Sequence, residues 1–166
     1  MAGTGGSLVA RMIGAAMLST DTFEEVEHDE TATGQAATVV AMVAAASAIG
    51  ASGSGLFAAG WAAVAAVVGW AVWAGLTFVI GTKVFDGRAT WGEVMRAIGF
   101  AQAPGILLIL GILPLMGLWL WIVPFWMLIA GFIGLREALD IGGFKTFFTI
   151  LIGAVAYAFL RALTPF

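Results

Sequence analysis

The side chains that could do acid–base or metal chemistry gather in one segment near the N-terminus. His28 is the only histidine, and six of the ten acidic residues lie around it: Asp21, Glu24, Glu25, Glu27, Asp29 and Glu30. A histidine can act as a general base near neutral pH, and clustered carboxylates can hold a cation. The spacing lacks the D-x-D-x-D-G pattern of a calcium loop. We therefore predict a hydrated acidic helix capped through Thr22 and Glu25, with His28 solvated and no catalytic, metal or cofactor site.

A second group of charges occupies two connections between apolar runs. The first connection carries Lys83, Asp86, Arg88, Glu93 and Arg96, and the second carries Arg136, Glu137, Asp140 and Lys145. Mixed signs predict internal pairing, of Glu93 with Arg96 and of Arg136 with Asp140, as well as pairs that clamp the two connections together. A docking surface for a partner protein is the alternative function of these residues.

One apolar run contains the only strongly polar side chain that lies well inside such a run, Gln102, and it is followed by Pro104. An amide in lipid most often forms a hydrogen bond to another helix, but it can also line a substrate path. Proline removes a backbone donor, so both Pro104 and Pro124 predict kinked helices.

The elements that carry these residues are membrane spans. Hydrophobic residues make up 61% of the 166 residues and charged residues only 10%, and the mean hydropathy is +1.05. We predict an all-α polytopic bundle of five transmembrane helices with a short N-terminal interfacial helix. The predicted spans are residues 36–52, 56–80, 97–113, 116–135 and 147–160, with Pro114 at the turn between the third and the fourth.

The chain divides into two predicted parts. Residues 1–34 form a cytoplasmic segment in which an apolar stripe over residues 8–18 favours a helix in the headgroup region, or a helix packed against the bundle. Residues 35–166 form the five-span domain. Small residues at helical spacing on the first two spans predict a tight hairpin. These residues are Ala37, Ala41, Ala45 and Ala48 on the first span and Ala58, Ala62, Ala66 and Gly69 on the second.

Basic residues set the expected orientation. Six lie on one side of the predicted spans and only Arg161 lies on the other; the six are Arg11, Lys83, Arg88, Arg96, Arg136 and Lys145. Under the positive-inside rule the N-terminus is cytoplasmic and the C-terminus external. The chain has no cysteine, which excludes disulfides and thiolate sites, and its acidic balance argues against a nucleic-acid partner.

Several segments together resemble a known family. They are the run GTKVFDGRATWGEVMRAIGFAQAP over residues 81–104, GLREALD over residues 134–140, Lys145-Thr146, and the acidic lead-in TFEEVEHD over residues 22–29. This arrangement resembles the Yip-type domain of five-span membrane proteins. The positions that match its motifs are Gly81, Arg96, Gly99, Gln102, Pro104, Arg136, Glu137, Ala138 and Leu139.

The resemblance implies a five-helix bundle without enzymatic activity. Eukaryotic relatives bind Rab GTPases in vesicle traffic, whereas many prokaryotic relatives have no assigned role. The short segment before the first span departs from the eukaryotic pattern, so we expect a bacterial protein of the inner membrane.

Our functional hypothesis is a non-catalytic scaffold or accessory subunit that binds membrane lipids and other membrane proteins or a larger membrane complex. The alternative hypothesis is a small-molecule or lipid transporter whose path runs near Gln102 and Pro104. A pigment-binding subunit is a third possibility, suggested by the aromatic residues. The residues that we expect to matter for interaction or structure are Gly81, Arg96, Gln102, Pro104, Arg136, Glu137 and Asp140.

Overall fold

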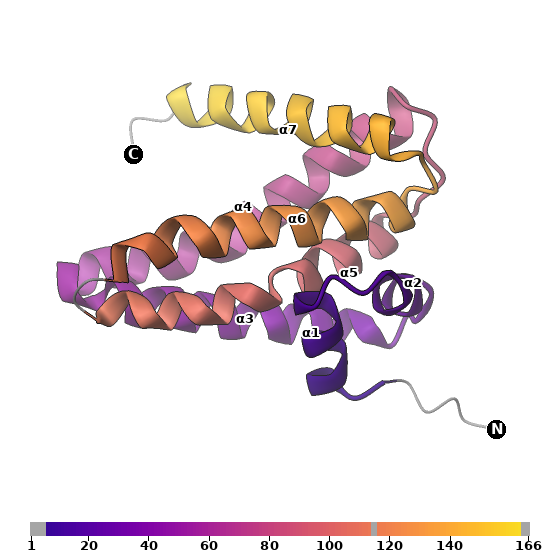
Figure 1. Ribbon diagram of the computed structural model, residues 1–166. Helices are drawn as coiled ribbons and strands as arrows, with labels where there is room; N and C mark the ends of the chain where they lie inside the picture. Colours follow the sequence, from indigo (N-terminus) through magenta and orange to yellow (C-terminus); the bar gives the residue numbers. More distant parts are fainter. Residues whose placement is uncertain (1–5, 114–115, 164–166) are drawn as a thin grey trace.

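The computed structural model describes residues 6–113 and 116–163, which form helices and no strand (Figure 1). The elements are α1 (Leu8–Ala16), α2 (Thr20–His28), α3 (Ala32–Ala51), η1 (Ser52–Ser54), α4 (Leu56–Lys83), α5 (Trp91–Ala101), η2 (Ala103–Ile112), η3 (Met116–Leu118), α6 (Trp119–Ala138) and α7 (Gly143–Leu163), where η denotes a 3-10 helix. The predicted all-α class is confirmed. Pro114, the predicted turn, lies outside the described residues.

Four segments are long and apolar enough to cross a membrane: Ala32–Ser54, Leu56–Lys83, Trp91–Ile112 and Trp121–Ala138. A helix rises 1.5 Å per residue, so about 20 residues match a hydrocarbon core of about 30 Å. In α7 the segment that counts as apolar, Gly143–Ala156, is shorter than this, although the helix itself continues to Leu163. The membrane bundle is therefore confirmed, and the predicted number of five spans is approximate.

The third span is broken in the middle. Helix α5 ends at Ala101, and the chain continues from Ala103 to Ile112 as a 3-10 helix with Pro104 in its first turn. Because a 3-10 helix rises about 2 Å per residue, η2 covers about 20 Å with ten residues. The α-helix in which a kink was predicted at Pro104 ends just before that residue, whereas Pro124 lies inside the continuous helix α6.

Helices α3 and α4 form the predicted hairpin, joined at Gly55. Gly55 has a φ of 101°, a left-handed conformation that glycine adopts without a Cβ clash. The predicted contact face on α3 is wrong, however. Ala37, Ala41 and Ala45 are exposed, because valines on the other side of α3 provide the larger apolar surface to bury.

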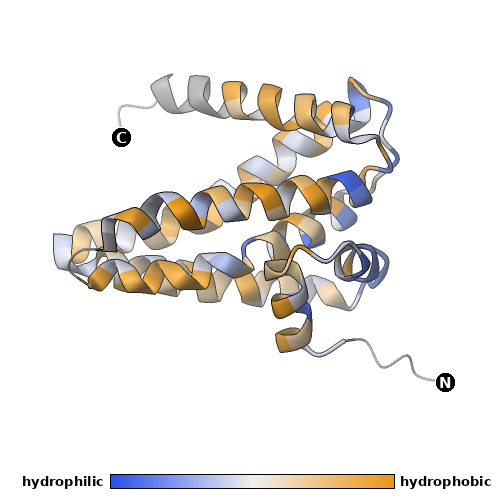
Figure 2. Cartoon of the chain, viewed as in Figure 1, coloured by the Kyte–Doolittle hydropathy of each residue, from blue (hydrophilic) through white to orange (hydrophobic). Residues whose placement is uncertain are grey.

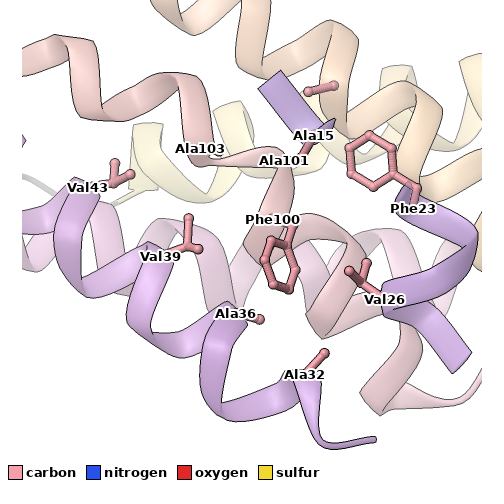
Figure 3. Packing of buried hydrophobic residues seen from close by; sticks show 11 residues of the cluster. Ala15, Phe23, Val26, Ala32, Ala36, Val39, Val43, Phe100, Ala101 and Ala103 are labelled. Carbon is pink, nitrogen blue, oxygen red and sulfur yellow. The ribbon is translucent and has the colours of Figure 1, made fainter. Parts of the chain in front are cut away.

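The main core lies where α2, α3, α5 and η2 meet (Figure 3). Its largest members are Phe23 and Phe100, which pack with Val26, Val39 and Val43. Close backbone contacts hold α3 against its neighbours. A Cβ on Gly99 would lie 2.9 Å from the Cβ of Ala36, and one on Gly50 would lie 2.1 Å from the carbonyl oxygen of Leu108.

Polar residues gather at one end of the bundle, on α2 and on the connections that flank α4, α5, α6 and α7 (Figure 2). The two charged connections meet there, as predicted, but the bonds involve backbone groups rather than ion pairs. The amide of Arg88 donates to the carbonyl of Leu139 at 2.9 Å, and Lys145 Nζ donates to the carbonyl of Phe85 at 3.2 Å.

Candidate functional site

Helix α2 packs on α5 and α6 at the polar end of the bundle, and α1 packs beside it on α5 and η2; we call residues 7–29 the N-terminal cap. Ser7 and Ser19 begin the two helices, since each hydroxyl accepts a bond from a backbone amide three residues later. The predicted cap at Thr22 is therefore wrong, because α2 begins two residues before it. The last turn of α1 is bound to a membrane helix by Trp126, whose indole N–H donates to the carbonyl of Ala16 at 2.8 Å.

Arg11 is the centre of a polar cluster under the cap. Its side chain is almost fully buried, and Nη2 lies 2.8 Å from Glu25 Oε1 and 2.5 Å from Asp29 Oδ2. Nη1 donates to Gln35 Oε1 on α3 at 2.9 Å. Arg11 thus ties α1 to α2 and α3. In the sequence Arg11 counted only as one of the six basic residues that set the orientation, although a buried arginine needs partners for its charge and its N–H groups.

The cluster lowers the pKa values of the two acidic residues that it contains. The hydrogen bond from Arg11, followed by one from the amide of Gly6, lowers the pKa of Glu25. The hydroxyl of Thr31 and then Arg11 lower the pKa of Asp29 to about 2. Both carboxylates are therefore held in their charged form, and part of the predicted hydrated acidic face is engaged in ion pairs.

Arg96 is the second buried arginine, and it binds the end of α2. Its Nε donates to the carbonyl of Val26 at 2.9 Å, and Nη2 donates to the carbonyl of Glu27. Nη1 reaches the hydroxyl of Thr33 at 3.3 Å. The last carbonyls of a helix have no partner within the helix, so a cation there satisfies them and complements the helix dipole.

The predicted pairing of Glu93 with Arg96 is consequently wrong. Glu93 caps its own helix: Oε2 accepts from the amide of Thr90 at 2.7 Å, and the hydroxyl of Thr90 accepts from the amide of Glu93. This reciprocal capping box satisfies two amides at the start of α5. The T-x-x-E spacing at residues 90–93 was a signal for it in the sequence.

Arg136 pairs with its neighbour Glu137, at 2.6 Å between Nη2 and Oε1, and not with Asp140 as predicted. Asp140 lies just after the end of α6 with a φ of 52°. In this left-handed conformation the chain has already left the helix, so the i to i+4 geometry that the pairing requires is not available. Aspartate tolerates the conformation better than most residues.

Glu27 is the other buried charged group of the cap. The residue is 7% exposed, and Oε1 lies 3.3 Å from His28 Nδ1. Burial raises the pKa of Glu27 to about 7; the charge of His28 opposes this rise. Acidic residues on α5, on α6 and just after α6 reinforce this rise, namely Asp140, Glu93 and Glu137. His28 itself is exposed, as predicted.

The remaining predicted residues lie at two other places. Gly81 packs under Leu139, where a Cβ would lie 2.6 Å from a methyl group of that side chain. Gln102 and Pro104 lie at the break between α5 and η2, with Gln102 half-buried and Pro104 buried. Within the described residues no three His, Cys, Asp or Glu side chains are grouped so as to hold a metal ion.

Comparison with known protein families gives a match over most of the chain. The family model of the Yip1 domain matches residues 14–163, which covers α2 to α7 and the end of α1. Neither a curated protein nor a solved structure matches the chain. The matched region includes Arg96, Glu27 and both charged connections, so the polar end of the bundle is part of the family's domain.

Proposed function

The chain belongs to the Yip1 domain family, and from this premise we propose that it is a non-catalytic membrane scaffold or accessory subunit that binds other membrane proteins. The apolar helices imply contact with lipid, and proteins of this family interact with other membrane proteins. The family is one of non-enzymatic membrane proteins. The partner and the scaffold role are our proposal.

The observation that carries the proposal is the exposure of small and apolar side chains on α3 and α4. On α3 the row Ala37, Ala41 and Ala45 is exposed, while the other side of the helix fills the core. On α4 the large side chains of Val64 and Val68 are also exposed, at 52% and 53%. Small residues at i, i+4 and i+8 let a second helix come close, which is the main source of helix association in lipid.

The cap supplies a further membrane contact. The exposed side chains Val9, Ile13 and Met17 form one row along α1, opposite the buried Arg11. We propose that this row lies in the headgroup region, on the cytoplasmic side, as the charge distribution indicates. A bacterial inner membrane remains our prediction for the location.

Isolation of the chain in a mild detergent, followed by mass spectrometry, tests the scaffold role. We expect a stoichiometric membrane partner with the unaltered chain and at least about tenfold less of it with Ala41→Leu, since the larger side chain keeps a second helix away. Ala154→Leu on α7 is the matched control, because Ala154 is also exposed. Recovery of the chain without any partner would count against the proposal.

The transporter alternative rests on the break at Gln102, since a 3-10 stretch within a helix often marks a hinge. A scaffold should tolerate Gln102→Leu and keep its partner. A transporter should lose uptake of its substrate in proteoliposomes with the same variant. The two measurements on this one substitution separate the two functions.

A further inference from the structure

The Glu27 carboxyl group is buried but only half satisfied. Oε1 faces His28 Nδ1, whereas Oε2 is enclosed and has no hydrogen-bond partner among the described residues. A carboxylate oxygen without water or a donor carries a large desolvation penalty. A buried acid in this state usually takes up a proton, which removes the charge.

The groups that face Glu27 from the neighbouring helices do not offset a negative charge. The carboxylates of Glu137 on α6 and of Asp140 just after it act on Glu27, and Glu137 is paired with Arg136. From α5 come Glu93, which caps its helix, and Arg96. The guanidinium of Arg96 donates to the backbone carbonyl of Glu27 rather than to its carboxylate.

The Arg11 cluster lies on the side of α2 that faces α1. Arg11 binds Glu25 and Asp29 there, together with Gln35 of α3. On α2 itself only His28 lies within ion-pair distance of Glu27, and the His28 side chain is 75% exposed, so water screens its charge. Glu27 is thus a buried acid in a mostly negative environment.

We propose that Glu27 is a proton-binding site that controls the docking of the N-terminal cap, in which the protonated carboxyl group holds α2 against α5 and α6. A proton fits this site because Oε2 is enclosed, whereas a metal ion or a partner's basic side chain would require the cap to open first. Ionisation leaves an unpaired charge under α2 and loosens the cap.

The direction of the pH dependence follows from the pKa values. Docking raises the pKa of Glu27 from 4.5 to about 7, so the docked cap binds more protons than the open one. Docking is therefore strongest at low pH and weakens about tenfold per pH unit between these two pKa values. Above about pH 7 the effect levels off, because Glu27 is then ionised in both states.

Other groups of the cap titrate differently. The carbonyl of Glu24, and then the charge of Glu27, raise the pKa of His28, so protonation of His28 also favours docking. This contribution is lost as the pH rises from the ordinary pKa of 6.5, which is above the range in which Glu27 alone acts. The pKa values of Glu25 and Asp29 are lowered, so their contribution is lost only below their ordinary values of 4.5 and 3.8. The range between about pH 5 and 6 therefore isolates Glu27.

Hydrogen–deuterium exchange of α2 in the full chain in lipid nanodiscs tests the proposal. After correction for the intrinsic exchange rate, we expect protection of α2 to fall about tenfold between pH 5 and 6. Glu27→Gln mimics the protonated group and should make protection independent of pH in this range. Glu24→Gln, an exposed position on the same helix, and His28→Gln should both keep the decline.

Infrared spectroscopy of the unaltered chain gives an independent measurement. A protonated carboxyl band should persist above about pH 6 and disappear as the pH rises through 7. The band should be absent from Glu27→Gln and from Glu27→Met, which serves if the first variant misfolds. The proposal would be overturned if the intensity of the carboxyl band in the unaltered chain did not change with pH. It would also be overturned if the protection of α2 in Glu27→Gln declined between pH 5 and 6 as it does in the unaltered chain.

Discussion

At the residue scale, the two buried arginines find partners for their charge and their N–H groups in two different ways. Arg11 neutralises its charge with two carboxylates, whereas Arg96 donates to two backbone carbonyls and a hydroxyl group. A buried cation that lacks such partners is costly, so each arginine fixes the position of the groups around it. Both arginines bind groups of α2, namely Glu25 in the case of Arg11 and the carbonyls of Val26 and Glu27 in the case of Arg96, and the position of α2 therefore depends on both arginines.

Removal of the Arg11 side chain should destabilise the cap. Arg11→Ala leaves Glu25 and Asp29 without their cation and opens a space in the cap. We expect a loss of about 2–3 kcal/mol, below the range for fully buried pairs because water reaches both carboxylates. Thermal unfolding in detergent, followed by circular dichroism, measures the loss. The matched control is the exposed Arg88→Ala, and equal melting temperatures for the two variants would contradict the prediction.

A lysine should not replace Arg96. The planar guanidinium group spans the carbonyls of Val26 and Glu27, and an ammonium group on a shorter, flexible chain cannot reach both with the same geometry. We expect Arg96→Lys to cost about 1–2 kcal/mol and to increase proteolysis in the segment between α2 and α3. Arg136→Lys, at an exposed ion pair, is the control with the same chemical change. If both variants resist protease equally, the role given to Arg96 is incorrect.

At the scale of the elements, hydropathy and turn residues predicted the spans well, because each apolar run must lie in lipid and each charged connection outside it. Packing faces were less predictable. Alanine spacing indicated one side of α3, but the valines on the other side bury more apolar surface and occupy the core. The partners of Glu93 and Arg136 also differed from the predicted ones. Glu93 caps the start of α5, and the left-handed conformation of Asp140 takes it off the helix that carries Arg136.

Close packing of α3 on η2 depends on a glycine. A Cβ on Gly50 would lie 2.1 Å from the carbonyl oxygen of Leu108, so Gly50→Ala must push the two backbones apart. We expect a cost of about 1–3 kcal/mol in thermal unfolding. Gly34→Ala in the same helix has open space around it and should stabilise by up to about 1 kcal/mol. We expect Gly50→Ala to lower the stability and Gly34→Ala to raise it, and equal changes in stability would refute the packing argument.

At the scale of the whole molecule, the separation of polar and apolar residues predicted the architecture, and tertiary contacts decided the polar site. The charged connections do meet at one end, as the topology required, but they are joined through the backbone of Arg88 and Leu139. The buried state of Glu27 depends on α2 folding back over α5 and α6. No local pattern in an acidic segment distinguishes one buried carboxylate from five that are less buried.

The same separation predicts how the protein lies in the membrane. Six basic residues flank the polar end and one lies beyond the last span, so the polar end should face the cytoplasm. Because the chain has no cysteine, single cysteines can report on each side. Ser54→Cys in the turn between α3 and α4 should react with an impermeant maleimide in intact cells, whereas Val84→Cys at the polar end should react only after lysis. Labelling of Val84→Cys from outside would reverse the orientation and place the Glu27 site on the external face.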